Sequence, residues 1–161
     1  MQQPMNQGET FDEGQVVSVL ADLVESLEDS RKGFLDAAEH LDRSGHHDLA
    51  ERMKQFSDHR TRLSLELREM ATGFGEPIEE SGSVGGAVHR GWMSIKDAVS
   101  DDDPHEVLAA AEKGEDHAVA EYERALEKIE LRNDVRKVIQ KQASEVRAAH
   151  DEVKMLRERY A

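Results

Sequence analysis

Four polar side chains interrupt stripes of apolar residues that would otherwise form a continuous helical core. In each stripe the apolar residues recur at alternating steps of three and four, the spacing of an amphipathic helix. Helix bundles hold cofactors and metals among inward-facing polar groups of this kind. These side chains therefore form either a buried structural layer or a binding site. The interrupting residues are Ser30, Arg60, Glu115 and Gln142.

Arg60 and Glu115 predict an ion pair buried at mid-height in the fold. Counted from the first hairpin turn, Ser30 and Arg60 lie at nearly equal distances along their helices, which puts them in one layer. If the second and third long helices run parallel, Glu115 joins that layer, and Gln142 faces Tyr122 nearby. Such a pair fixes helix register, and removal of one partner would cost about 3 to 5 kcal/mol.

A metal site is the alternative interpretation, with iron or manganese as the cofactor. The candidate ligands are Asp29, His59, Glu115 and His150. Di-iron bundles place a glutamate three residues before each histidine ligand. Phe56 stands at that position before His59. Arg147 stands there before His150, so both paired motifs are broken. Arg60 would also oppose a metal, since a positive charge ~5 Å from a dication costs roughly 7 kcal/mol at an effective dielectric of about 20.

Four long helices must position these residues. Thr10 and Glu13 form a capping box at the start of the first helix, and Gly45 follows its end. Asp103 is a candidate N-cap, with Pro104 at the first helical position of the third helix. The predicted helices run from Thr10 to the turn at Ser44, over Leu49–Gly73, from Pro104 to Ile129 and over Val135–Tyr160.

The connections between these helices predict the topology. Short turns after the first and third helices make two antiparallel hairpins, which a long crossover joins. Within the crossover, a stripe at Val84, Val88, Trp92, Ile95 and Val99 predicts a shorter helix. The expected fold is therefore an all-α, ferritin-like four-helix bundle with a short extra helix between helices two and three. It forms one domain over residues 10–161, after a mobile tail at residues 1–9.

The composition excludes several classes of partner and of binding site. The formal charge of −14 over 161 residues would repel nucleic acid and anionic lipid, while acidic patches could attract cations. Cysteine is absent, which removes thiolate metal sites and disulfides. The polar start MQQPMNQGET lacks the apolar segment of a secretory signal, and no apolar run is long enough to span a bilayer. We expect a cytoplasmic protein that binds neither nucleic acid nor membrane, with a homo-oligomer as one possible assembly.

Three segments carry a resemblance to a known family. They are Glu80–Met93, which contains His-Arg-Gly-Trp, then Gly114–Asp116 and Tyr122–Leu126. Over about residues 15–158 the chain resembles bacterial four-helix-bundle proteins of the ferritin-like group that are known only as a domain of unknown function. The resemblance implies a ferritin-like fold and a bacterial cytoplasmic setting, and it implies no activity. Ferritins and rubrerythrins themselves use Glu-x-x-His ligands, from which this sequence departs at both histidines.

The sequence therefore favours a non-enzymatic bundle protein, such as a stress-associated structural or interaction protein. Two alternatives stay open. One is a metal-dependent oxidoreductase or iron-handling protein that uses His59, Glu115 and His150. The other is a module that binds a small molecule or a partner through the glycine-rich crossover and Trp92.

Overall fold

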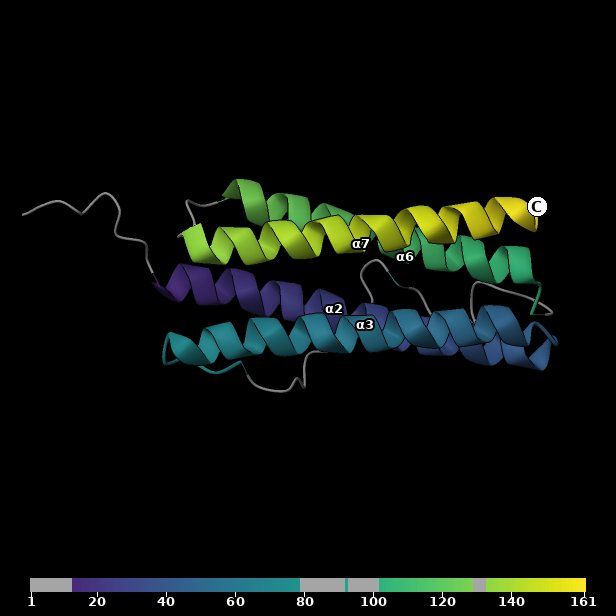
Figure 1. Ribbon diagram of the computed structural model, residues 1–161, viewed down its shortest axis with the longest axis horizontal. Helices are drawn as coiled ribbons and strands as arrows, with labels where there is room; N and C mark the ends of the chain where they lie inside the picture. Colours follow the sequence, from purple (N-terminus) through teal and green to yellow (C-terminus); the bar gives the residue numbers. More distant parts are fainter. Residues whose placement is uncertain (1–12, 79–91, 93–101, 129–132) are drawn as a thin grey trace, which may run out of the picture.

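Four α-helices make up the part of the chain that the structure, a computed structural model, describes (Figure 1). The described residues are 13–78, 92, 102–128 and 133–161, and they contain no strand. The helices are α2 (Glu13–Arg43), α3 (His47–Gly73), α6 (Pro104–Lys128) and α7 (Asn133–Arg159). None of them combines the length and apolar character that crossing a membrane requires. The all-helical prediction is confirmed, with boundaries close to the expected ones.

Local signals set the helix ends. After α2, the backbone N–H of His46 donates to the Leu41 carbonyl at 2.8 Å, and that of Gly45 donates to Asp42 at 3.1 Å. Gly45 has φ +85°, so glycine supplies the left-handed residue of this Schellman turn. At the start of α6, the Asp103 carboxylate accepts the backbone N–H of His105 at 2.8 Å, as expected of an N-cap.

Two of the predicted features lie outside the described residues. The tail at residues 1–9, together with the Thr10 cap, precedes the first described residue. The predicted crossover helix falls within residues 79–101, of which only Trp92 is described, and Trp92 lies outside regular secondary structure.

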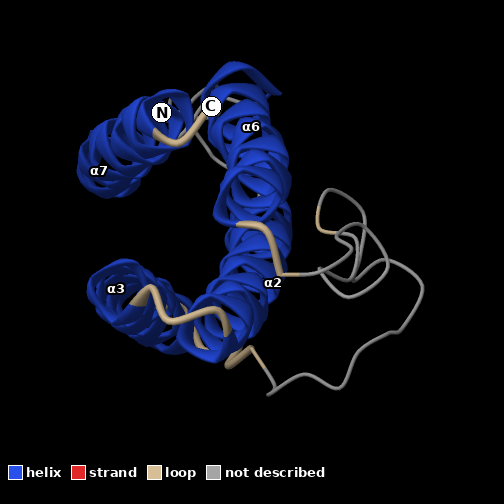
Figure 2. Ribbon diagram, turned by 90° about the vertical axis from the view of Figure 1, so that its right-hand side faces the viewer, coloured by secondary structure: helices blue, strands red, loops and turns tan. Residues whose placement is uncertain are grey.

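The helices form two antiparallel pairs, α2 with α3 and α6 with α7. Seen end-on, α3, α2, α6 and α7 follow one another around an arc, with α2 packed against α6 at its centre (Figure 2). The two ends of the arc, α3 and α7, approach each other closely at only a few positions. Helices α3 and α6 run in the same direction (Figure 1). Arg60 and Glu115 each lie near the middle of their helix, which puts them at one level.

The core has two apolar halves. One contains Leu20, Leu27, Leu67 and Ile139, and the other contains Phe34, Met53, Leu108 and Val153. Along three of the helices the polar interruption falls between the two halves: Ser30 lies between Leu27 and Phe34 of α2, Arg60 lies between Phe56 and Leu63 of α3, and Glu115 lies between Ala111 and Ala118 of α6. Gln142 of α7 lies within the first half, between Ile139 and Val146. The polar layer therefore divides the interior instead of lining one end of it.

Trp92 reaches the core from the crossover. Its side chain is 5% exposed and meets the Phe34 ring edge-on, with ring centroids 5.2 Å apart. The indole lies against both Gly33 of α2 and Gly114 of α6, where a Cβ at either glycine would overlap its ring atoms. The alternative that uses the glycine-rich crossover and Trp92 as a binding surface stays a prediction, because residues 79–91 and 93–101 of the crossover lie outside the described residues.

We predict that Gly33→Ala and Gly114→Ala destabilise the protein, although alanine favours a helix by about 1 kcal/mol over glycine. The added methyl group must displace the indole, and overpacking of this kind costs typically about 1 to 3 kcal/mol. Urea denaturation measures the change. Gly73→Ala is the matched control, because a Cβ there meets nothing within 4 Å.

In a Trp92→Ala background the two glycine substitutions should lose most of their cost, since the ring they would displace is gone. Additive costs in the double variants would contradict the packing described for the indole.

Candidate functional site

Arg60 of α3 and Glu115 of α6 meet in the interior. Arg60 Nη2 donates a hydrogen bond to Glu115 Oε1, and both side chains have 0% exposure. The Arg60 guanidinium also lies over the Phe34 ring, 5.5 Å from its centroid. An arginine keeps its proton at every physiological pH, so the interior holds a permanent cation whose nearest counter-charge is Glu115.

The protein does not satisfy every polar atom of this layer. Within the described residues, Ser30 Oγ, Arg60 Nε and Nη1, and Glu115 Oε2 have no hydrogen-bond partner. Buried groups without partners are costly, and the low dielectric around them strengthens both the attraction and the penalty. The pair is therefore better understood as a register constraint than as a source of net stability.

Burial raises the pKa of Glu115 above its ordinary value, because removal from water disfavours the carboxylate. The positive charge of Arg60 opposes this rise, and His150 opposes it at longer range. Burial and these positive charges thus act on the pKa of Glu115 in opposite directions, and loss of Arg60 would remove the largest of the causes that lower it.

A second polar layer, around Gln142 of α7, is connected throughout. Tyr122 Oη donates to Gln142 Oε1 at 2.7 Å, and Gln142 Nε2 donates to Glu66 Oε1 at 2.8 Å and to the Leu63 carbonyl at 3.3 Å. Burial raises the pKa of Tyr122 well above its usual range, so its hydroxyl stays protonated as a donor. This layer links α3, α6 and α7 without a net charge at the tyrosine.

The structure does not bring the candidate metal ligands together. His59 Nε2 contacts Glu145 Oε1 at 2.7 Å, on the side of the bundle between α3 and α7. His150 contacts Asp116 at 2.6 Å and Asp151 at 3.0 Å. Asp29 is half-buried on α2 and has an interaction of its own.

These residues do not fit a two-metal centre. Glu115, the one fully buried acid among the candidates, is in contact with a guanidinium. Among the residues that the structure describes, no three His, Asp or Glu side chains are grouped so that they could hold an ion. No chemical step through iron or manganese can be built on this arrangement.

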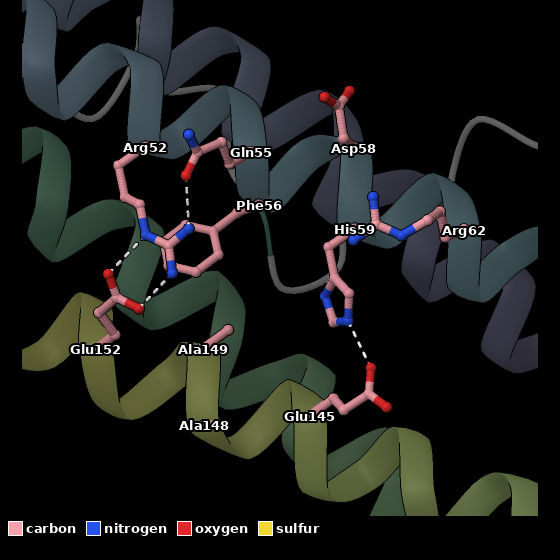
Figure 3. Close-up of a pocket in the computed structure, with 10 residues that line it drawn as sticks. All are labelled: Arg52, Gln55, Phe56, Asp58, His59, Arg62, Glu145, Ala148, Ala149 and Glu152. Atoms are coloured by element: carbon pink, nitrogen blue, oxygen red, sulfur yellow. Dashed lines mark hydrogen bonds and ion pairs between the residues drawn. The ribbon is translucent and has the colours of Figure 1, made fainter.

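A groove open to solvent, with a volume of about 500 Å³, lies between α3 and α7 and was not predicted from the sequence (Figure 3). Two side-chain pairs cross it, one between an arginine and a glutamate and the other between a histidine and a glutamate. Arg52 Nε and Nη2 donate to the two carboxylate oxygens of Glu152 at 2.7 and 2.6 Å, and His59 pairs with Glu145 seven residues along each helix. The sequence signal for the groove is the matching seven-residue spacing of Arg52 and His59 on α3 and of Glu145 and Glu152 on α7.

The pKa values of two histidines, His59 and His150, are shifted in opposite directions. Burial is the main cause that lowers the pKa of His59, and the hydrogen bond to Glu145 only partly offsets it. Burial also opposes protonation of His150, but its hydrogen bonds to Asp151 and Asp116 outweigh burial and raise the pKa. His59 is therefore neutral near pH 7, with Nε2–H as the donor to Glu145.

Comparison with known proteins gives one match. Residues 15–128, more than half of the chain, match the family described as "Domain of unknown function (DUF2383)". No curated protein and no solved structure matches the sequence significantly.

We predict that Glu115→Leu lowers the free energy of unfolding by about 3 to 5 kcal/mol, because the Arg60 charge is then buried without compensation. Arg60→Leu should cost a similar amount. The double variant should recover most of the loss, since two apolar side chains replace the pair. Urea denaturation of the unaltered protein, the two single variants and the double variant completes a double-mutant cycle. A loss in the double variant equal to the sum of the two single losses would contradict the pairing.

We predict that NMR titration of the imidazole protons gives a midpoint below 6.5 for His59 and above 6.5 for His150. The proton on His150 contributes stability that is fully present below pH 6.5 and is lost as pH rises through the raised pKa. His150→Gln should therefore be destabilising mainly in acid. An equal loss at pH 9 would contradict this assignment.

Proposed function

We propose that this chain, which belongs to the DUF2383 family of unknown function, is a non-enzymatic ferritin-like bundle protein with a structural or interaction role. One observation carries the proposal: the fully buried contact between Arg60 and Glu115. A cation that cannot be deprotonated lies among the inward-facing groups that would otherwise be free to bind metal.

The helix arrangement supports the ferritin-like part of the proposal. Two antiparallel pairs, α2 with α3 and α6 with α7, lie with α3 and α6 running in the same direction (Figure 1). A connection between parallel helices must return along the bundle, and one long crossover of this kind distinguishes ferritin-like folds from simple up-and-down bundles. The bacterial and cytoplasmic setting belongs to the same proposal.

The non-enzymatic part follows from what the central residues already do. Glu115 neutralises Arg60, and Gln142 joins Tyr122 to Glu66. The fully buried acid of these layers, Glu115, is committed to a structural contact with Arg60. The polar layers are thus suited to holding four helices in register.

We predict that protein purified without chelator from iron- and manganese-supplemented cells contains far less than one metal ion per chain. Plasma mass spectrometry provides the measurement. Glu115→Ala should leave the metal content unchanged, because Glu115 is not a ligand in this account. Stoichiometric iron or manganese that disappears in Glu115→Ala would support an iron-handling or oxidoreductase role instead.

Arg60→Gln provides a second arm for the same measurement. It removes the positive charge while retaining polar atoms in the layer, and metal uptake by this variant alone would identify Arg60 as the group that excludes metal. Uptake by the unaltered protein would contradict the proposal.

A further inference from the structure

The central polar layer, formed by Ser30, Arg60 and Glu115, has more hydrogen-bonding capacity than its protein contacts use. A guanidinium carries N–H donors on each of its nitrogens, and an ionised carboxylate accepts at both oxygens. Arg60 Nη2 donates to Glu115 Oε1, but Arg60 Nε and Nη1 and Glu115 Oε2 meet no partner among the described residues. Ser30 Oγ, which can both donate and accept, has no partner there either.

These atoms lie at one level of the bundle. Ser57 Oγ donates to the Arg31 carbonyl at 3.1 Å, which fixes α3 against α2. Arg60 lies one turn after Ser57, so it stands near the level of Ser30 in the antiparallel pair. Glu115 joins them through its contact with Arg60. Unpaired donors and an unpaired acceptor therefore share one layer of the core.

Neither bulk solvent nor the apolar surroundings can supply the missing partners. The side chains of Ser30, Arg60 and Glu115 are all fully buried. The Phe34 ring, whose centroid lies 5.5 Å from the guanidinium carbon, adds a cation–π attraction but no lone-pair acceptor. Buried polar atoms in native proteins nearly always have a partner, which is either protein or ordered water, and a charged group without one is especially costly.

The side chains around the pair are small. On α2 the layer holds Ser30, whereas the neighbouring core positions of that helix hold leucine and phenylalanine. On α6, Ala111 and Ala118 flank Glu115 about one turn away on either side, and both are buried. A water molecule needs only about 10 to 15 Å³ of probe volume and about two to four polar partners. Small residues combined with unpaired polar atoms are the environment that binds buried water.

Charge selects a neutral ligand. The guanidinium of Arg60 repels a cation, and the carboxylate of Glu115 repels an anion, while the two together are neutral. The unpaired atoms of the pair are donors on one partner and an acceptor on the other. A ligand that joins them must therefore accept and donate at once, as water does, and bridging water is nearly as favourable as a direct hydrogen bond.

We propose that the central polar layer binds buried water, which accepts hydrogen bonds from Arg60 Nε and Nη1 and donates to Glu115 Oε2, with Ser30 Oγ as a further partner. This inference rests on the same buried contact as the proposed function, but the two can fail separately. Slow solvent exchange of the Arg60 Nε–H proton reports its burial, and magnetisation transfer from water reports the bound molecule.

NMR of the full chain, labelled with ¹⁵N at arginine, tests the proposal at pH 7. Water-selective NOE and ROE spectra are recorded on the Nε–H signals. Arg60 should show a water cross-peak of opposite sign in the two spectra, which is the pattern of a water molecule that tumbles with the protein. The exposed Arg147 is the control, and it should show exchange peaks of the same sign in both.

Two variants separate bound water from the hydroxyl of Ser30, whose proton also exchanges with solvent. Ser30→Ala removes the hydroxyl without adding volume, so the Arg60 cross-peak should remain. Ser30→Val places a branched apolar side chain in the same space and should reduce the peak at least about threefold. Circular dichroism of each variant establishes that the helices are intact before the spectra are compared.

A protected Arg60 Nε–H proton without a water cross-peak would overturn the water site and leave the Arg60–Glu115 contact standing. Loss of the peak in Ser30→Ala, or an unchanged peak in Ser30→Val, would also overturn the site. Exchange of the Arg60 proton as fast as that of Arg147 would contradict burial of the guanidinium, and with it both this inference and the proposed function.

Discussion

A guanidinium that cannot lose its proton lies at 0% exposure inside this bundle, and the rest of the structure accommodates it. Glu115 stands at the level of Arg60, because both residues lie near the middle of their helices and α3 and α6 pack in one register. The apolar core then divides into two halves, one on each side of the layer. Because some polar atoms of the layer have no protein partner among the described residues, its role is better explained by specificity than by stability.

The two sides of the bundle differ in how their helices meet. On the side of α2 and α6, Trp92 lies between Gly33 and Gly114, and two glycines give an indole the room that any other residue would take. On the side of α3 and α7, two side-chain pairs cross a groove instead, Arg52 with Glu152 and His59 with Glu145. The two sides are therefore held by different contacts: ring packing on one, and an Arg–Glu ion pair with a His–Glu hydrogen bond on the other.

The sequence predicted the helices because their signals are local. Apolar periodicity, the Gly45 turn and the Asp103 cap each act within a few residues, and the structure has all three. Counting residues along each helix from its hairpin turn also predicted that Arg60 and Glu115 lie at the same height, because both turns are short. The groove could not be predicted in this way, because it depends on the separation of α3 and α7, which adjoin no common turn. The contact of Trp92 with two glycines could not be predicted either, because a glycine within a helix does not indicate which side chain packs against it.

A crystal structure at atomic resolution, from crystals soaked with ferrous iron and measured at the iron absorption edge, tests the central claim most directly. The account predicts an unbroken contact between Arg60 and Glu115 and no anomalous peak in the bundle interior. An anomalous peak at mid-height with Glu115 and a histidine as ligands, and the Arg60 side chain turned towards solvent, would contradict it.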